Sequence, residues 1–415
     1  MKTRLACSLG LLVACVLTLS STTVFAQEAK LREDLSRSFT QFDLTRPDAS
    51  RSDGKIDSVR IRAVGRDLEL IVWENDMYSP NYRAENTTSI GRVGLDQPRI
   101  NTFQGRIRGE VGSEVRLTID DGKIEGFFDL GLQRYFIEPA DRYSSSASSE
   151  QLVIYQEKDV LADTSFYCAA DMPEKIRLGE ALLAKDNAES MMLASKNLEV
   201  ATDADLQYVL LLGGPAQANS NITSILNMVE GTYASQLDLE ITITYQHTWS
   251  AADPFGGANS GEVLLNFLDH WNTNFPRSSY PRDTAHLFSG KSYVLSAGIA
   301  FVGAVCYTPQ YAYGVSGHVS WAPGKYLVPA HEIGHNLGAE HAEAAQGCGN
   351  TIMNAFLGSG AVLTFCPYSR TEIGTFINQN GSCLLGGSGP TPTPTPTPPT
   401  PTPTPIPTAT PTPFP

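Results

Sequence analysis

Apolar and polar residues alternate along the first third of the chain, from about Ser38 to Tyr155. The alternation is clear in SVRIRAV (Ser58–Val64) and in VRLTID (Val115–Asp120). A period of two places the apolar side chains on one face of a strand. Asp121-Gly122 follows the second stretch and precedes KIEGFFDL, which is a strong signal for a hairpin. These patterns predict a small antiparallel β domain.

The pattern changes in the second half of the chain. Residues between about Pro173 and Ala204 are polar and helix-prone, and they contain basic residues accessible to proteases. This composition predicts a linker. LQYVLLLG, which starts at Leu206, is a near-continuous apolar run, as expected for a central strand buried on both faces.

Helices and strands then alternate towards the C-terminus. Apolar residues recur at helical spacing in two stretches, at Ile222, Ile225, Leu226 and Val229 and then at Leu264, Phe267, Leu268 and Trp271. Three other stretches predict strands: LEITITYQHTW (Leu239–Trp249), TAHLFSG and GIAFVGAVCY. Such alternation predicts an α/β domain built on a mixed sheet.

Both ends of the sequence differ in composition from a folded domain. A basic start, an apolar run and Val24-Phe25-Ala26 predict a signal peptide over residues 1–26. Leu12–Cys15 resembles a bacterial lipobox, so a periplasmic protein or a lipid anchor on Cys15 is the alternative. The Thr/Pro repeats within residues 388–415 predict an extended, disordered tail. No later run is long and apolar enough to span a bilayer, so we expect a secreted protein.

Charge and cysteine content narrow the choice of partners. The formal net charge of −14 argues against nucleic acid as the main partner, and we expect a monomer. Two of the seven cysteines leave with the signal peptide. Four others lie in the last third of the chain and predict two disulfides, with three possible connectivities: Cys306, Cys348, Cys366 and Cys383. Cys168 lies outside this set.

The clearest chemistry lies in HEIGHNLGAEH, His331–His341. On a helix, His331 and His335 lie on the same face and can direct two imidazoles at one metal ion. Gly338 can adopt a positive φ and end the helix, so that His341 returns as a third ligand. Three protein ligands with an open fourth position are typical of catalytic zinc, and Glu332 beside the first ligand can take a proton from water there. We expect no metal ligand among the other histidines, His247, His270, His286 and His318.

The spacing H-E-x-x-H-x-x-G-x-x-H resembles the metzincin clan of zinc endopeptidases. Met353, in NTIMNAF, lies where that clan has a methionine turn beneath the metal. GIAFVGAVC is similar to the edge strand of the adamalysin (reprolysin) branch, and the stretch from Cys348 to Leu385 is similar to the ending of that branch. The resemblance covers roughly residues 204–385. It implies a β-rich propeptide domain (27–172), a linker or activation segment (173–203) and an α/β metzincin-like catalytic domain (204–387).

The same resemblance implies two disulfides, Cys306–Cys383 and Cys348–Cys366. Two positions depart from related patterns. Ala342 follows the third histidine where the adamalysin branch usually has an aspartate, which removes a hydrogen-bonding anchor. Ala355 stands where the astacin-like and serralysin-like branches have a tyrosine ligand, which argues against those branches.

Hydrolysis of peptide bonds is the activity that the resemblance implies. Glu332 would take a proton from a water activated by zinc and hand it to the leaving amine. The strand Gly298–Cys306 would hold an extended substrate, and the apolar loop after Met353 would line a primed-side pocket. Two alternatives remain: a secreted binding or adhesion protein that keeps the fold, and a zinc hydrolase acting on other substrates. The presence of Glu332 argues against the first, and the edge strand argues against the second.

Cys168 lies between the β domain and the linker. A thiolate is a good fourth ligand for zinc. The adamalysin and matrix metalloprotease families use a propeptide cysteine to keep the enzyme latent, so the resemblance implies this switch for Cys168. Ala169 replaces the glycine that often follows that cysteine. The alternatives are a buried thiol that packs as a small apolar side chain and an intermolecular disulfide.

Overall fold

The computed structural model of the chain describes residues 26–161, 166–168, 196–291, 298–358 and 360–384. Three predicted segments therefore lie wholly or mostly outside the described residues: the signal peptide up to residue 25, the linker or activation segment (173–203) up to residue 195, and the Thr/Pro tail. Among the helices that the structure describes, none has the length and apolar character needed to cross a membrane.

The first sheet is antiparallel and has nine strands, in the order β1-β11-β10-β9-β8-β7-β4-β3-β2. Their bounds are β1 Asp43–Thr45, β2 Asp48–Ser52, β3 Lys55–Ala63, β4 Arg66–Glu74, β7 Thr102–Ile107, β8 Val115–Asp120, β9 Lys123–Leu130, β10 Gln133–Pro139 and β11 Leu152–Tyr155. Because β1 contacts β3 near the opposite edge, the sheet curls around a core of its own. The predicted hairpin is confirmed: Asp120 pairs with Lys123 across Asp121-Gly122, and both turn residues have positive φ.

The second sheet is mixed and has seven strands, in the order β16-β17-β15-β13-β14-β5-β6. Their bounds are β5 Tyr78–Thr88, β6 Gly91–Leu95, β13 Lys196–Ala204, β14 Leu239–Trp249, β15 Thr284–Ser289, β16 Gly298–Ala300 and β17 Tyr313–Gly317. The inner pairs are parallel, whereas β16 and β6 run antiparallel at the two edges. The predicted mixed sheet is therefore confirmed.

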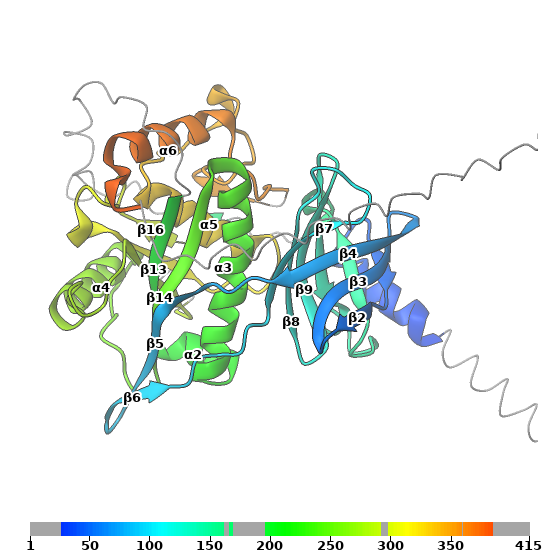
Figure 1. Ribbon diagram of the computed structural model, residues 1–415, viewed down its shortest axis with the longest axis horizontal. Coiled ribbons are helices and arrows are strands. Elements are labelled where there is room, and N and C mark those ends of the chain that lie inside the picture. The colour runs from blue at the N-terminus through cyan, green and yellow to red at the C-terminus, as the bar shows by residue number, and fades with distance from the viewer. Residues whose placement is uncertain (1–25, 162–165, 169–195, 292–297, 359, 385–415) are drawn as a thin grey trace, which may run out of the picture.

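The two sheets do not divide the chain at one position. Strands β5 and β6 come from the predicted β-rich region, yet they extend the second sheet beside β14 (Figure 1). The chain thus crosses from the first sheet to the second after β4 and returns for β7. Period-two alternation identifies such strands but carries no information about which sheet they join.

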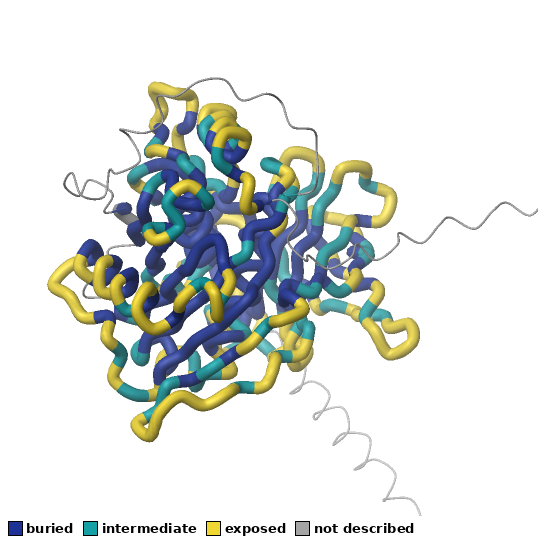
Figure 2. The backbone as a smooth tube through the Cα atoms, turned by 60° about the vertical axis from the view of Figure 1, so that its left-hand side comes forward, coloured by how far each residue is buried: buried dark blue, intermediate teal, exposed yellow. Residues whose placement is uncertain are grey.

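Helix α3 lies between the two sheets, because it contacts β14 on one side and β7 and β8 on the other (Figure 1). The helices are α2 Leu206–Leu212, α3 Pro215–Leu237, α4 Ser260–Asn274, α5 Gly324–Asn336 and α6 Pro367–Asn380, and residues 26–35 are also helical. The two helices predicted from apolar spacing correspond to α3 and α4. Figure 2 shows buried residues gathered along the inner strands and helices, with exposed residues mainly at loops and edges.

Two strand predictions need correction. Of GIAFVGAVCY only Gly298–Ala300 forms a strand, β16, because the chain then turns, with positive φ at Gly303 and Cys306. LQYVLLLG forms helix α2 and not the central strand that we expected. The central strand is β13, which lies directly before this helix, in residues that we assigned to the linker. The Asp205 side chain accepts a hydrogen bond from the Tyr208 amide at 2.8 Å and caps the helix, while Gly213 ends it with φ 87°. Leu210 and Leu211 are 69% and 58% exposed, so the apolar run is not buried on both faces.

Candidate metal centre

Helix α5 carries the first two predicted metal ligands, His331 and His335, one turn apart. After it ends at Asn336, Gly338 takes φ +87°, and an added Cβ there would lie 2.7 Å from the ring of Phe376. Glycine is therefore required both by the backbone conformation and by the close packing. The turn brings His341 back to the helix, as the spacing predicts.

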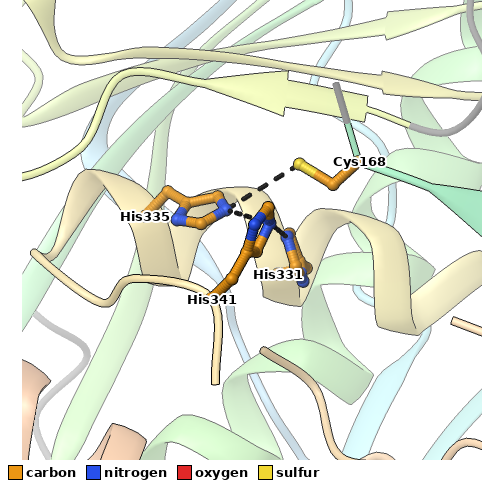
Figure 3. A group of neighbouring side chains, drawn as sticks. All are labelled: Cys168, His331, His335 and His341. Carbon is orange, nitrogen blue, oxygen red and sulfur yellow. Dashed lines mark hydrogen bonds between the residues drawn. The ribbon is translucent and has the colours of Figure 1, made fainter. Parts of the chain in front are cut away.

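The three imidazoles face one another (Figure 3). The Nε2 atom of His341 lies 3.3 Å from Nε2 of His335 and 3.3 Å from Nε2 of His331. The other ring nitrogens donate to backbone carbonyls: Nδ1 of His331 to Ile352 at 2.6 Å, and Nδ1 of His335 to Ala339 at 2.7 Å. These bonds fix the tautomer that leaves both Nε2 lone pairs directed at the shared point.

Burial keeps the rings of His331 and His335 neutral. It lowers the pKa of His331 well below its usual value, with the neighbouring rings of His335 and His341 acting in the same direction. Burial likewise lowers the pKa of His335 to about 3. Neutral imidazole is the form that binds a metal ion.

Cys168 completes the group. Its Sγ lies 3.8 Å from Nε2 of His335, and the donor atoms of Cys168 and the three histidines all lie within 4.8 Å of one another. Zinc–nitrogen distances of about 2.0–2.1 Å in a tetrahedral site separate two nitrogens by about 3.3 Å, as observed here. The donor set of three imidazoles and one thiol also suits zinc, so the residues fit this ion.

Glu332 is 1% exposed and projects from α5 beside this group. Within the described part of the chain, its Oε2 atom has no hydrogen-bond partner. Burial raises the pKa of this carboxyl well above its usual value, and a hydrogen bond with Cys168 acts in the opposite direction. A buried carboxylate oxygen without a partner is costly in a core, but it is useful where a proton must be moved.

Comparison with known proteins identifies the second half of the chain. The sequence model of the Reprolysin (M12B) family zinc metalloproteases matches residues 211–387. These residues are a reprolysin domain. Its family is one of zinc-dependent endopeptidases, which are hydrolases.

Two solved structures are similar to the chain at low identity. A chaperone–substrate complex is 13% identical with a TM-score of 0.35, and the match covers 46% of this chain and 36% of that one. This chain therefore spans about a third of that protein. Metalloproteinase-II from Bacteroides fragilis is 12% identical with a TM-score of 0.44, covering 83% of this chain and 94% of that one.

Met353 lies beneath the predicted metal ligands of the reprolysin domain. An added Cβ on Gly334 of α5 would lie 2.7 Å from its sulfur, so the two residues pack closely. The Met353 carbonyl accepts from the Ala342 amide at 2.9 Å, and Asn354 Nδ2 donates to the Ala342 carbonyl at 2.6 Å. The segment that follows the third ligand is thereby tied to the turn that contains Met353.

Glu343 is a supporting residue that the sequence reasoning missed. Its carboxylate accepts from Asn354 Nδ2 at 3.0 Å and from the Ala355 amide at 3.1 Å. Glu343 therefore anchors the methionine turn. It lies one residue after Ala342, the position at which the resemblance led us to expect an aspartate. The acidic residue at the next position was the available signal.

The reprolysin domain has two disulfides, Cys306–Cys383 and Cys348–Cys366, the same pairs that the resemblance implies. The remaining histidines lie elsewhere. His247 bonds Asp203, His286 bonds Ser316 with its pKa lowered to about 3 by burial, and His318 packs against Tyr208. His270 is half-buried against the rings of Trp249 and Phe255.

Gly298 on the edge strand β16 sets the position of Glu332. An added Cβ would lie 2.4 Å from Glu332 Oε1 and 2.8 Å from the Val315 carbonyl. We expect Gly298→Ala to lower kcat by about 100-fold, because Glu332 is the predicted general base and moving a reacting group by about 1 Å has this effect. Steady-state kinetics with zinc content measured in parallel tests it. Gly94→Ala is the control, since a Cβ there meets nothing within 4 Å; an unchanged kcat in Gly298→Ala contradicts the prediction.

Proposed function

We propose that the chain is the precursor of a secreted zinc endopeptidase, in which Glu332 is the general base and Cys168 keeps the site latent. The observation that carries the proposal is the group of three converging imidazoles beside a buried carboxylate with one oxygen unpartnered among the described residues. Two disulfides in the reprolysin domain support an extracellular location.

His331, His335 and His341 would hold the metal, and Cys168 would occupy its fourth position. When bound, zinc supplies Lewis-acid chemistry that activates water and polarises a carbonyl. Glu332 would accept the proton of the attacking water and deliver it to the leaving amine. No described residue bonds its Oε2, which leaves this oxygen available for the transfer.

The backbone around the site supports a peptide as the substrate. β16 is the edge strand of the second sheet, so its outer side can pair with an extended chain. The backbone of Cys168 forms an isolated parallel β-bridge with Gly298 of β16, and the Cys168 amide donates to the Ala355 carbonyl at 3.1 Å. The residues just before it form β12 (Phe166–Tyr167), which pairs with β18 (Phe356–Leu357).

This contact pattern also supports latency. The segment that carries Cys168 lies along the strand that we assign to substrate binding, with its thiol among the metal ligands. A substrate could not pair with Gly298 while this segment is in place. Leu357 and Ala361, both buried, follow Met353 and support an apolar primed-side pocket.

Removal of the metal tests the activity. We expect a zinc chelator to abolish cleavage of casein by the activated protein, because the histidines alone cannot activate water. Addition of zinc after removal of the chelator should restore the rate. The control is the chelator already saturated with zinc, which should leave cleavage unchanged. Cleavage that persists in protein shown by elemental analysis to be free of metal would rule out the proposal.

A further inference from the structure

We infer that residues 27–161 remain bound to the reprolysin domain as a second chain of the enzyme after the linker between Cys168 and Lys196 is cut. This inference rests on the proposed function, because it takes the chain to be a precursor that is cut in this linker. The N-terminal part is the binding partner of the reprolysin domain, since its strands β5 and β6 form one side of the second sheet. The N-terminal part thus supplies structure to the protease and does not only cover it.

Backbone pairing provides the first support. Residues of β14 from Ile243 to Trp249 pair with β5, and β6 then covers the outer side of β5. All residues of the eleven-residue strand β14 except Glu240 are buried. Removal of β5 would turn β14 into a long apolar edge with unpaired amides and carbonyls, which is an aggregation-prone arrangement. β6, by contrast, is mostly exposed and suited to an edge.

Side-chain hydrogen bonds also join β5 to β14, and we call this boundary the first seam. Tyr245 donates to Glu85 at 2.6 Å, and Tyr82 donates to Gln246 at 2.7 Å. Thr87 bonds Nε2 of the fully buried His247 at 2.9 Å, and Nδ1 of that ring lies 3.1 Å from Asp203 on β13. Departure of β5 would leave these buried polar groups without their partners, which is more costly than the bonds themselves are worth.

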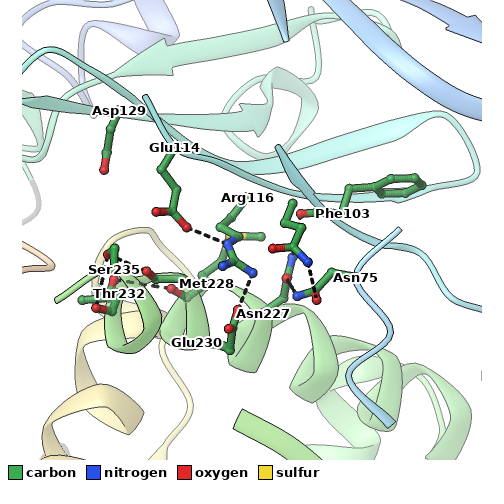
Figure 4. A network of polar contacts seen from close by, with 12 residues as sticks. Asn75, Phe103, Glu114, Arg116, Asp129, Asn227, Met228, Glu230, Thr232 and Ser235 are labelled. Carbon is green, nitrogen blue, oxygen red and sulfur yellow. Dashed lines mark hydrogen bonds and ion pairs between the residues drawn. The ribbon is translucent and has the colours of Figure 1, made fainter. Parts of the chain in front are cut away.

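A second seam joins the first sheet to α3 (Figure 4). Arg116 of β8 forms an ion pair with Glu230 of α3, and both side chains are more than nine-tenths buried. Nearby, Asn75 donates to the Asn227 side chain at 2.9 Å, and Asn227 donates to the Leu117 carbonyl at 3.0 Å. Separation of the sheet from α3 would leave opposite charges on two parted surfaces.

The helix that carries the metal ligands depends on the first sheet as well. Lys325, near the start of α5, is 6% exposed and lies 3.0 Å from both Glu125 of β9 and Glu138 of β10. Its charge is therefore balanced by residues of the N-terminal part. Loss of that part would leave the lysine, six residues before His331 on α5, without these two carboxylates.

The contacts of the blocking segment, residues 166–168, are separate from both seams. The described part of this segment meets the site through the pairing of β12 with β18, the β-bridge of Cys168 to Gly298, the Cys168 amide bonded to Ala355, and the thiol, which lies among the histidines and bonds Glu332. The segment around Cys168 can therefore leave the site without breaking either seam. Opening of the site and loss of the N-terminal part are separate events.

The decisive experiment places a recognition sequence for a site-specific protease between Cys168 and Lys196 of the full chain carrying Glu332→Ala. After complete cutting, we expect both pieces to elute from gel filtration together, at the volume of the uncut protein. Two separate peaks would overturn the inference. Because the readout is association in a variant without the proposed base, it does not depend on the proposed function, which could fail independently.

Two threonine variants of the cut protein test the seam itself. Thr87→Val removes the bond to His247, and we expect the apparent dissociation constant of the pieces, from serial dilution, to rise about five- to tenfold. Thr88→Val is the matched control, since this hydroxyl donates to Gly91 of the same piece; less than a twofold change is expected. Both uncut variants must match the parent by circular dichroism. Equal dissociation constants for the two variants would contradict the role of this seam.

Active enzyme matured from the unmodified chain provides a check that needs no variant. N-terminal sequencing of the purified active fraction should give two N-termini in equal amounts, one from each piece. A single N-terminus that belongs to the C-terminal piece would overturn the inference.

Discussion

Glu332→Gln should reduce the turnover of the activated enzyme by about 10²- to 10⁴-fold, the usual contribution of general acid–base catalysis. The substitution keeps the shape of the side chain but removes its capacity to accept a proton. Since Glu332 is buried and its pKa is raised by burial, replacing it with a neutral amide should not destabilise the fold. Kinetics on a peptide substrate, with zinc content determined on the same sample, measure the effect.

Glu340→Gln is the matched control for this variant. Glu340 is exposed and precedes His341 in the same motif, so its replacement tests a change of charge near the site. We expect its turnover to stay within about twofold of the parent, as for a surface substitution. Full activity of Glu332→Gln, at equal zinc content, would show that another group moves the proton.

Cys168→Ser should make the uncut precursor active. A hydroxyl is a much weaker ligand than a thiolate, and changes even in the outer shell of a zinc site alter metal affinity about 10- to 100-fold. We therefore expect the uncut variant to cleave a small peptide at least about tenfold faster than the uncut parent. Small substrates are the better probe, because the main chain of residues 166–168 still pairs with the site.

The double variant Cys168→Ser, Glu332→Gln controls for a contaminating protease and should be inactive. Denaturing gels taken before and after the assay must show that the chain is still uncut. Activity equal to that of the parent precursor would mean that the thiol does not hold the enzyme latent, and that Cys168 is a packing residue instead.

The chemistry of the site could be predicted from sequence because its determinants are local. His331 and His335 are one helical turn apart, and Gly338 takes the positive φ that returns His341. The resemblance likewise placed Met353 below the helix. Glu343 was missed because its role depends on hydrogen bonds to the methionine turn eleven and twelve residues later.

The arrangement of the sheets could not be predicted in the same way. β13 contains polar residues such as Asn197 and Asp203, so its sequence resembles that of a linker. Only the structure shows that these side chains are buried against hydrogen-bonding partners. Those partners are distant: Thr242 donates to Asn197 at 2.8 Å, and Trp271 donates to Asp203 at 2.7 Å. β5 pairs with a strand about 160 residues away, and its local pattern is that of any strand. Long-range pairing of this kind leaves no periodic signal.

The course of the second sheet has a practical consequence for recombinant expression. A gene fragment limited to residues 211–387, the span of the family match, encodes β14, β15, β16 and β17 but not β13, β5 or β6. β13 lies between β14 and β15 in the sheet, so the fragment would lack the strand that joins these two. Without β5, the other edge of β14 would also be unpaired. Production of soluble enzyme therefore calls for the whole chain, matured after folding, rather than for the segment that sequence comparison marks as the protease.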